Sequence, residues 1–166
     1  EGADYSEQPK ADLILVTHHH SDHFDPDAIA EIRKKDTVVI STEKVAHALE
    51  GVTVLHNGER TTWNGITIRA TPAYNIVNMR APGEPFHIPG EGNGYVMEID
   101  PLRIYIAGDT ELIPEMIISA NTFPSTIELL LIGATSILAM VPRSFSPATI
   151  SVPSPIAPAK IRIVIR

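Results

Sequence analysis

The stretch Ala11–Asp25 reads ADLILVTHHHSDHFD, and it sets both the fold and the chemistry that the rest of the chain must accommodate. Its first seven residues form a nearly continuous apolar run, which is typical of a buried strand whose end opens onto a polar loop. Alternate residues at a strand end point to the same side, so His18 and His20 can bind one cation. Asp22 and His23 lie in the following turn and face an adjacent point. One short loop can therefore bind two metal ions, which share a water, lower its pKa and stabilise an attacked carbonyl or phosphoryl oxygen.

The alternative for this stretch is a solvated polar loop that binds nothing. Four of the seven histidines of the chain lie within six residues, with an acid among them, and this pattern favours metal binding. His19 alternates with the two expected ligands, so we expect it to face away from the metals. His47 and His56 lie in a predicted helix and a predicted strand, where surface or core roles are expected.

The composition excludes several classes of function. The chain has 166 residues, with 13 Lys and Arg against 20 Asp and Glu, and this net charge of −7 favours a small-molecule substrate over a nucleic acid as partner. There is no cysteine, so any metal must be bound by His, Asp or Glu. No apolar run is long enough to cross a membrane and the first residues carry no export signal, which predicts a cytoplasmic protein without a membrane partner.

Apolar patterns and turn residues predict helices between the first three strands and a run of strands afterwards. Asp25 and Pro26 mark the start of a helix, and Asn64-Gly65 marks a hairpin turn. The segment Ala81–Gly94 holds three prolines and four glycines, which predicts a long irregular loop. The other predictions are strands at 11–17, 37–41, 52–56, 94–100, 102–107, 127–132 and 161–165, a hairpin over 59–73, a helix over 42–49 capped by Thr42, and a short helix through Ile118 capped by Thr110.

Three later motifs accompany the histidine cluster: Thr71-Pro72-Ala73-Tyr74-Asn75, Pro85-Phe86-His87 and, directly after a predicted strand, Gly108-Asp109-Thr110. Together the four motifs resemble the metallo-β-lactamase superfamily, and within it the small metal-dependent hydrolases related to L-ascorbate 6-phosphate lactonase. The resemblance runs from about Ala11 to Met116, and the first motif is highly specific.

The resemblance implies an α/β fold, the αββα sandwich of this superfamily, and a binuclear centre. In that centre His18 and His20 would bind the first metal, Asp22 and His23 the second, and Asp109 would bridge the two. The usual histidine after Ala-Tyr is replaced by Asn75, so His87 is expected to supply the third imidazole of the first site. Asn75 could instead hydrogen-bond a substrate or a ligand. The plainer alternatives are an exposed loop histidine for His87 and a turn or cap acid for Asp109.

The function implied by the resemblance is a hydrolase in which a metal-bound hydroxide attacks a small ester, a lactone or a related carbonyl substrate. Two Zn²⁺ ions are expected, with Mn²⁺ as the alternative. Asp22 and Asp109 are the expected catalytic residues, which orient the nucleophile or pass a proton to the leaving group. The alternatives are β-lactamase or phosphodiesterase activity at the same site, or a degenerate relative that binds metal without turnover.

The two ends of the chain depart from the family pattern. Relatives begin with a pair of strands that has no counterpart before Ala11, and they end with a histidine on the second metal, whereas no histidine follows His87. We therefore expect a sandwich without its N-terminal strands, an incomplete second site and a truncated or frame-altered form of a longer protein. Residues 1–132 are predicted to form the hydrolase domain, and the acid-free, proline-rich residues 133–166 an atypical C-terminal segment of the same domain. An uncovered sheet edge would favour a homo-oligomer.

Overall fold

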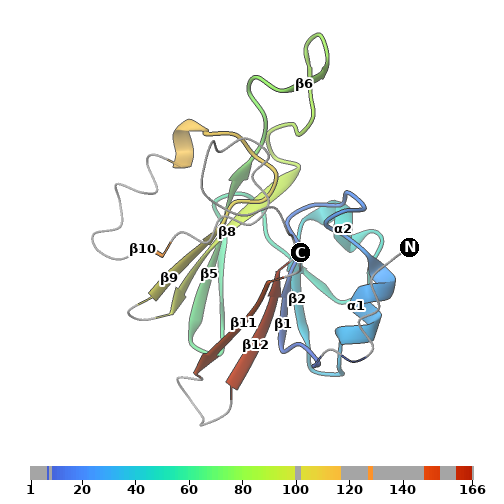
Figure 1. Cartoon of the computed structure of the whole chain (residues 1–166), viewed down its shortest axis with the longest axis vertical. Coiled ribbons are helices and arrows are strands. Elements are labelled where there is room, and N and C mark those ends of the chain that lie inside the picture. Colours follow the sequence, from blue (N-terminus) through green and yellow to red (C-terminus); the bar gives the residue numbers. More distant parts are fainter. Residues whose placement is uncertain are drawn as a thin grey trace. The chain divides into compact units, whose positions relative to one another are not determined.

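The computed structural model, shown in Figure 1, describes residue 7 and residues 9–99, 102–116, 127–128, 148–153 and 160–165. The chain divides into two compact units. The first unit comprises Glu1–Val54 and Phe145–Arg166, and the second comprises Leu55–Ser144. Each unit contains a five-stranded sheet of its own. The predicted division of the chain at residue 132 stays a prediction.

The sheet of the first unit is mainly parallel, as the alternation of strands and helices predicts. Its strands lie in the order β11 (Ala148–Pro153), β12 (Lys160–Ile165), β1 (Leu13–Leu15), β2 (Val38–Ser41) and β3 (Val52–Val54). Only the β11–β12 pair is antiparallel among these strands. The helices α1 (Pro26–Ile32) and α2 (Glu43–Ala46) connect β1 to β2 and β2 to β3.

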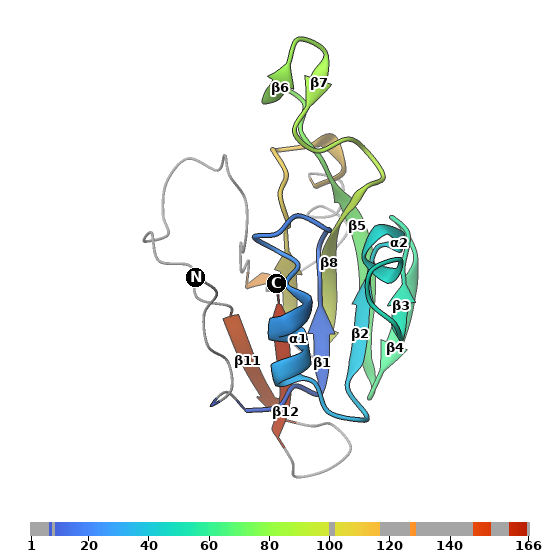
Figure 2. The same cartoon turned by 90° about the vertical axis from the view of Figure 1, so that its right-hand side faces the viewer.

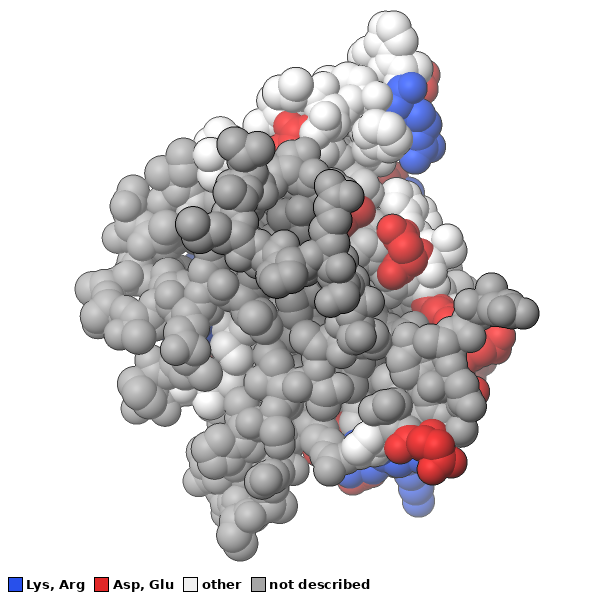
Figure 3. All heavy atoms as spheres, viewed as in Figure 1, with Lys and Arg blue, Asp and Glu red and all other residues white. Residues whose placement is uncertain are grey.

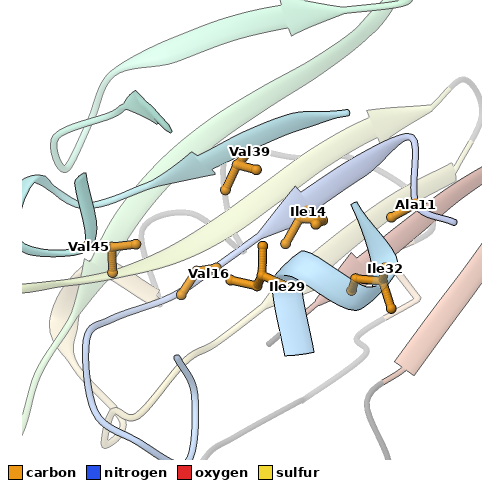
Figure 4. Packing of buried hydrophobic residues seen from close by; sticks show 7 residues of the cluster. All are labelled: Ala11, Ile14, Val16, Ile29, Ile32, Val39 and Val45. Carbon is orange, nitrogen blue, oxygen red and sulfur yellow. The ribbon is translucent and has the colours of Figure 1, made fainter. Parts of the chain in front are cut away.

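The core of the first unit forms where both helices pack on its sheet. Ile14 of β1, Val39 of β2, Ile29 of α1 and Val45 of α2 belong to one buried cluster, and each of them is at most 1% exposed (Figure 4). All three residues of β1 are buried, which confirms the strand inferred from the continuous apolar run. This packing holds the end of β1 in place, directly before the histidine cluster.

The two helices begin where the sequence predicts, but they differ in length and capping. Asp25 caps α1, because its Oδ1 accepts hydrogen bonds of 3.1 Å from the backbone N–H groups of Asp27 and Ala28. The predicted helix 42–49 is too long, since α2 ends at Ala46. Thr42 occupies the N-cap position without a side-chain cap hydrogen bond. The chain must turn into β3 within a few residues, and Gly51 makes this turn with a φ of +73°.

The sheet of the second unit is antiparallel apart from one short strand. Its order is β10 (Ile127–Glu128), β9 (Leu102–Ile106), β8 (Gly92–Ile99), β5 (Ile66–Ala73) and β4 (Arg60–Trp63), with β10 parallel to β9. The predicted hairpin over 59–73 is confirmed, because Asn64 and Gly65 both have positive φ angles, of 46° and 78°. Positive φ at both turn residues is what a two-residue hairpin of type I′ requires.

The prediction of an irregular loop over Ala81–Gly94 is wrong at both ends. Met79–Ala81 (β6) and Glu84–Pro85 (β7) pair as a two-stranded ribbon, and β8 already begins at Gly92. Figure 2 shows this ribbon, β6–β7, extending beyond the ends of β5 and β8. A two-stranded ribbon tolerates proline because each strand has an unpaired edge.

Gly94 explains why a glycine-rich segment still forms a strand. A Cβ atom at this position would lie 2.6 Å from Thr71 Oγ1 and 2.8 Å from the carbonyl oxygen of Ile106. The neighbouring strands therefore approach β8 so closely that only glycine fits. Gly94, one of the glycines from which an irregular loop was predicted, is thus required within the sheet.

Several predictions near the C-terminus can be compared only in part. The last strand is confirmed as β12, whereas β11 was not predicted because Pro153 and the many small residues obscure it. β11 is an edge strand, where a terminal proline removes no ladder bond that the sheet needs. Most of the predicted strand 127–132 and the end of the predicted helix near Ile118 lie outside the described residues. Among the described residues, no helix is long and apolar enough to span a membrane.

Candidate metal centre

The first group of site residues lies in residues 17–25, which we call the histidine loop. Its start is held to β2, because Val16 N donates to Ile40 O at 3.1 Å and Ser41 Oγ donates to Val16 O at 2.8 Å. A turn follows in which His23 N donates to the His20 carbonyl at 2.9 Å, and this turn brings His23 back toward the end of β1. The loop ends at Asp25, the cap of α1. Both ends of the loop are therefore fixed by regular structure.

Two imidazoles of the histidine loop, those of His20 and His23, contact the ring of His18, which is only 2% exposed. The ring centroid of His18 lies 4.6 Å from that of His20 and 4.3 Å from that of His23. His18 Nε2 is 3.1 Å from His20 Nδ1. On the other side, Thr17 Oγ1 lies 3.0 Å from His18 Nδ1 and 3.4 Å from His23 Nδ1.

This grouping has a chemical consequence. Protonated imidazoles at such distances repel each other, whereas neutral imidazoles present nitrogen lone pairs, which are good ligands for Zn²⁺ and similar cations. Asp22 adds a carboxylate at the rim, where its side chain is 73% exposed and its Oδ2 lies 3.7 Å from His23 Nε2. The centroid of the His19 ring is 4.9 Å from that of His20. The loop thus brings His18 together with both His20 and His23, and Asp22 together with His23.

The second group of site residues lies in the second unit and joins His87, Asp109 and Asn75. His87 Nε2 lies 3.4 Å from Asp109 Oδ2, and both side chains are nearly buried, with 13% and 10% of their surfaces exposed. On the other side of the ring, His87 Nδ1 lies 2.7 Å from Asn75 Oδ1. The His87 backbone N–H also donates to Asn75 Oδ1 at 3.1 Å. His87 is therefore an enclosed histidine held on both sides, and the structure excludes an exposed loop histidine.

The network continues from Asn75 to Glu111, a residue that the sequence did not single out. Asn75 Nδ2 donates to Glu111 Oε1 at 3.1 Å. The backbone N–H groups of Ile76 and Val77 donate to Glu111 Oε2 at 3.0 and 2.8 Å, and that of Asn78 donates to Oε1 at 2.7 Å. Burial by itself raises the pKa of Glu111, but these four hydrogen bonds outweigh it and lower the pKa to about 2.

Thr110 ties the same loops together and does not cap a helix as predicted. Its Oγ1 accepts a hydrogen bond from Tyr74 N at 3.1 Å and lies 3.0 Å from the Tyr74 carbonyl. Glu111 N donates to that carbonyl at 3.1 Å. Helical structure starts only at residue 114. The segment after β5 is thus fastened to the segment that follows Asp109.

The ribbon β6–β7 and its flanks expose apolar side chains beside this second group. The exposed large apolar residues of this part of the chain are Ile76, Val77, Met79, Phe86 and Ile88. In the space-filling view of Figure 3 the upper end of the molecule, where the ribbon lies, is mostly neither acidic nor basic. Ile76 and Val77 donate to Glu111 through their backbone N–H groups, and their side chains are exposed.

Neither Glu111 nor Thr17 carried a signal that the sequence alone would reveal. Glu111 follows a recognisable Gly-Asp-Thr motif, but its partners are backbone groups about 35 residues away in sequence. Thr17 is the last residue of an apolar run and looks like its polar end. The roles of His18, His20, Asp22, His23, His87 and Asp109 as metal ligands, and of Asn75 in binding substrate, stay predictions.

Comparison with known proteins places these features in a family context. A family model described as "Beta-lactamase superfamily domain" matches residues 2–138. A UPF0173 metal-dependent hydrolase of Methanosphaerula palustris is 32% identical over 126 residues, which cover 74% of this chain and 56% of the relative. That of Pelotomaculum thermopropionicum is 33% identical over 132 residues, which cover 77% and 58%. The chain therefore spans a little more than half the length of these relatives.

A solved structure gives the same result. A protein from Parabacteroides distasonis, named as a metal-dependent hydrolase, is 47% identical with a TM-score of 0.63, and the match covers 69% of this chain and 51% of that one. The metallo-β-lactamase fold expected from the four motifs is thus confirmed by sequence and structural similarity.

Proposed function

This chain belongs to the family described as "Beta-lactamase superfamily domain". We therefore propose that it acts as a metal-dependent hydrolase on a small ester or lactone. The observation that carries the proposal is the contact of three imidazoles, of His18, His20 and His23, in one short loop after a buried strand. A single buried or partly buried histidine is common in proteins, whereas a buried His18 in contact with both His20 and His23 is a donor arrangement suited to a cation.

The donor atoms present fit a divalent cation. Neutral imidazole nitrogens and carboxylate oxygens are ligands of Zn²⁺ and Mn²⁺, and both groups of site residues combine the two donor types. From the resemblance we propose His18, His20 and His87 for the first metal, Asp22 and His23 for the second, and Asp109 for both. When bound, such cations act as Lewis acids and lower the pKa of a coordinated water.

The side chains themselves set the remaining chemistry. Asp22 is open to solvent, so its carboxylate can exchange a proton with water and pass it to a leaving group. Asp109 is nearly buried beside His87, where it orients its neighbours and is shielded from bulk water. The exposed apolar side chains around the ribbon β6–β7 are suited to a substrate with an apolar portion. A small molecule therefore remains the proposed partner.

A second candidate function for this site, and the alternative to hydrolysis, is metal binding without turnover. β-Lactam and phosphodiester hydrolysis use the same metal chemistry and are tested together with esters and lactones.

The test combines metal analysis with a substrate screen. Metal content per chain is measured by inductively coupled plasma mass spectrometry for the wild type and for a His18→Ala/His20→Ala variant. The matched control is His47→Ala/His56→Ala, which removes two exposed histidines outside both groups. Each protein is then assayed with lactones, aryl esters, a chromogenic β-lactam and phosphodiesters.

The outcomes distinguish a hydrolase from a protein that binds metal without turnover. About two metals per chain with ester or lactone hydrolysis, lost only in the His18/His20 variant, supports the proposal. One retained metal without turnover identifies the binding protein instead. A wild type that binds no added Zn²⁺ or Mn²⁺ contradicts both.

A further inference from the structure

The second group of site residues contains a histidine flanked by two hydrogen-bond acceptors. Asn75 Oδ1 lies 2.7 Å from Nδ1 of the His87 ring, and Asp109 Oδ2 lies 3.4 Å from its Nε2. A neutral imidazole carries one proton, so it can donate to only one of the two. Which nitrogen is protonated decides whether His87 can bind a cation on the side of Asp109.

The orientation of the Asn75 amide is determined by its other partners. The His87 backbone N–H can only donate, and it points at Oδ1 at 3.1 Å. The Glu111 carboxylate accepts from Nδ2 at 3.1 Å, and it is itself held by three backbone N–H groups. A flipped amide would place Nδ2 against a donor and Oδ1 against a carboxylate. The oxygen of Asn75 therefore faces His87.

We infer that Asn75, oriented by Glu111, positions His87 by keeping its ring proton on Nδ1, so that the Nε2 lone pair is directed toward Asp109. An amide oxygen can only accept, so the 2.7 Å contact requires a proton on Nδ1. Without Asn75, Asp109 would be the remaining acceptor of this pair, and the proton would move to Nε2. That tautomer blocks the nitrogen that would act as a ligand.

The inference rests on the proposed function only in its consequence, which is that Asn75 and Glu111 are positioning residues for a metal ligand. An acceptor that fixes the tautomer of a ligating histidine typically changes metal affinity by about 10- to 100-fold. The tautomer itself is a property of the metal-free protein and can be measured without metal or substrate.

The experiment records long-range ¹H–¹⁵N correlations of the histidine rings in the metal-free protein at about pH 8, above the ordinary histidine pKa. A His87→Gln variant assigns the signals. Asn75→Leu removes the acceptor at similar volume, Glu111→Gln removes the anchoring charge, and the double variant Asn75→Asp/Glu111→Gln keeps an acceptor without placing two carboxylates against each other. The control is Glu115→Gln, because Glu115 accepts a hydrogen bond from Tyr74 OH nearby but does not contact Asn75 or His87 through any hydrogen bond of the described residues.

We expect a proton on Nδ1 of His87 in the wild type, in Asn75→Asp/Glu111→Gln and in Glu115→Gln. In Asn75→Leu the proton should move to Nε2, and in Glu111→Gln the Nδ1 proton should exchange faster with solvent. Zinc dissociation constants should rise about 10- to 100-fold in Asn75→Leu and stay unchanged in Glu115→Gln.

Two results would overturn the inference. One is a wild-type His87 with a proton on Nε2, alone or together with Nδ1. The other is an Asn75→Leu variant that folds and keeps the wild-type tautomer. If Asn75→Leu does not fold, Glu111→Gln and Asn75→Asp/Glu111→Gln decide through the ring signals. If the wild type binds no zinc, the proposed function fails while the tautomer measurement still stands.

Discussion

Replacing Glu111 by glutamine should destabilise the second unit in a way that depends on pH. The carboxylate accepts four hydrogen bonds, from Asn75 Nδ2 and from the backbone of Ile76, Val77 and Asn78. A glutamine oxygen can accept about two of them, and its NH₂ group would face donors. Losing one or two hydrogen bonds to a charged, buried acceptor costs about 2–4 kcal/mol. We expect the free energy of unfolding to fall by about this amount near neutral pH.

The sign of the pH dependence follows from the pKa of Glu111, which drops from 4.5 to about 2 in the folded chain. The stabilisation is complete above the unfolded value of 4.5, and it is lost as the pH falls toward about 2, because the unfolded state binds the proton first. The difference in unfolding free energy between wild type and Glu111→Gln should therefore shrink over this range. Other carboxylates titrate in both proteins and cancel in the difference.

The assay is urea unfolding followed by the fluorescence of Trp63, the single tryptophan of the chain, which lies on β4 of the same unit. Curves are recorded at several pH values for the wild type, Glu111→Gln and the control Glu115→Gln. The control should differ from the wild type by less than about 1 kcal/mol, since glutamine keeps an oxygen that can accept the part-buried hydrogen bond from Tyr74 OH. Equal stabilities of wild type and Glu111→Gln at neutral pH, or a difference independent of pH, would refute the reasoning.

Three further substitutions test the packing around the site. Gly94→Ala should lower the free energy of unfolding by about 1–3 kcal/mol and lower the zinc content. The added Cβ would lie 2.8 Å from Ile106 O and 3.0 Å from Ala107 O, just before Asp109. Unchanged stability would contradict this steric argument. Ile29→Ala should lower the free energy of unfolding by about 2–5 kcal/mol, because it opens a cavity in the core of the first unit. Thermal or urea unfolding followed by circular dichroism measures this loss. A loss below about 1 kcal/mol would contradict the prediction, because it would mean that the neighbouring side chains fill the cavity. Asp25→Ala should cost about 1 kcal/mol through loss of the α1 cap, whereas Asp25→Asn should retain most of the stability.

The elements that the sequence predicted are those whose signals are local. The start of α1 depends on Asp25 and Pro26, and the β4–β5 hairpin depends on Asn64 and Gly65. Each of these two signals acts over two or three neighbouring residues, so the start of α1 and the β4–β5 turn could be predicted without knowing which distant residues contact them. The apolar run before the histidine loop is similar, because a continuous run of this length can only be a buried strand or part of a buried helix.

The sequence predictions were wrong where one residue type is compatible with two structural roles. Glycine marks a loop when considered alone, but Gly94 is required inside β8 by the close approach of Thr71 and Ile106. Thr110 resembles a helix cap, yet its hydroxyl is used by Tyr74, 36 residues earlier. Composition cannot distinguish these cases, because the deciding atoms belong to other strands.

The candidate site shows the same division between local and long-range information. The sequence alone predicted His18 and His20 on one side of the strand end, with Asp22 and His23 at an adjacent point, since all four lie within one strand end and one turn. Only the tertiary structure decided how His87 is held, because Asn75 contacts His87 across 12 residues of sequence and Glu111 binds Asn75 across 36. Hydrogen bonds between loops depend on where the sheet carries each loop, and this depends on the packing of the whole unit. The candidate ligands can therefore be predicted from the sequence, while the hydrogen-bond partners of His87 are determined by the fold.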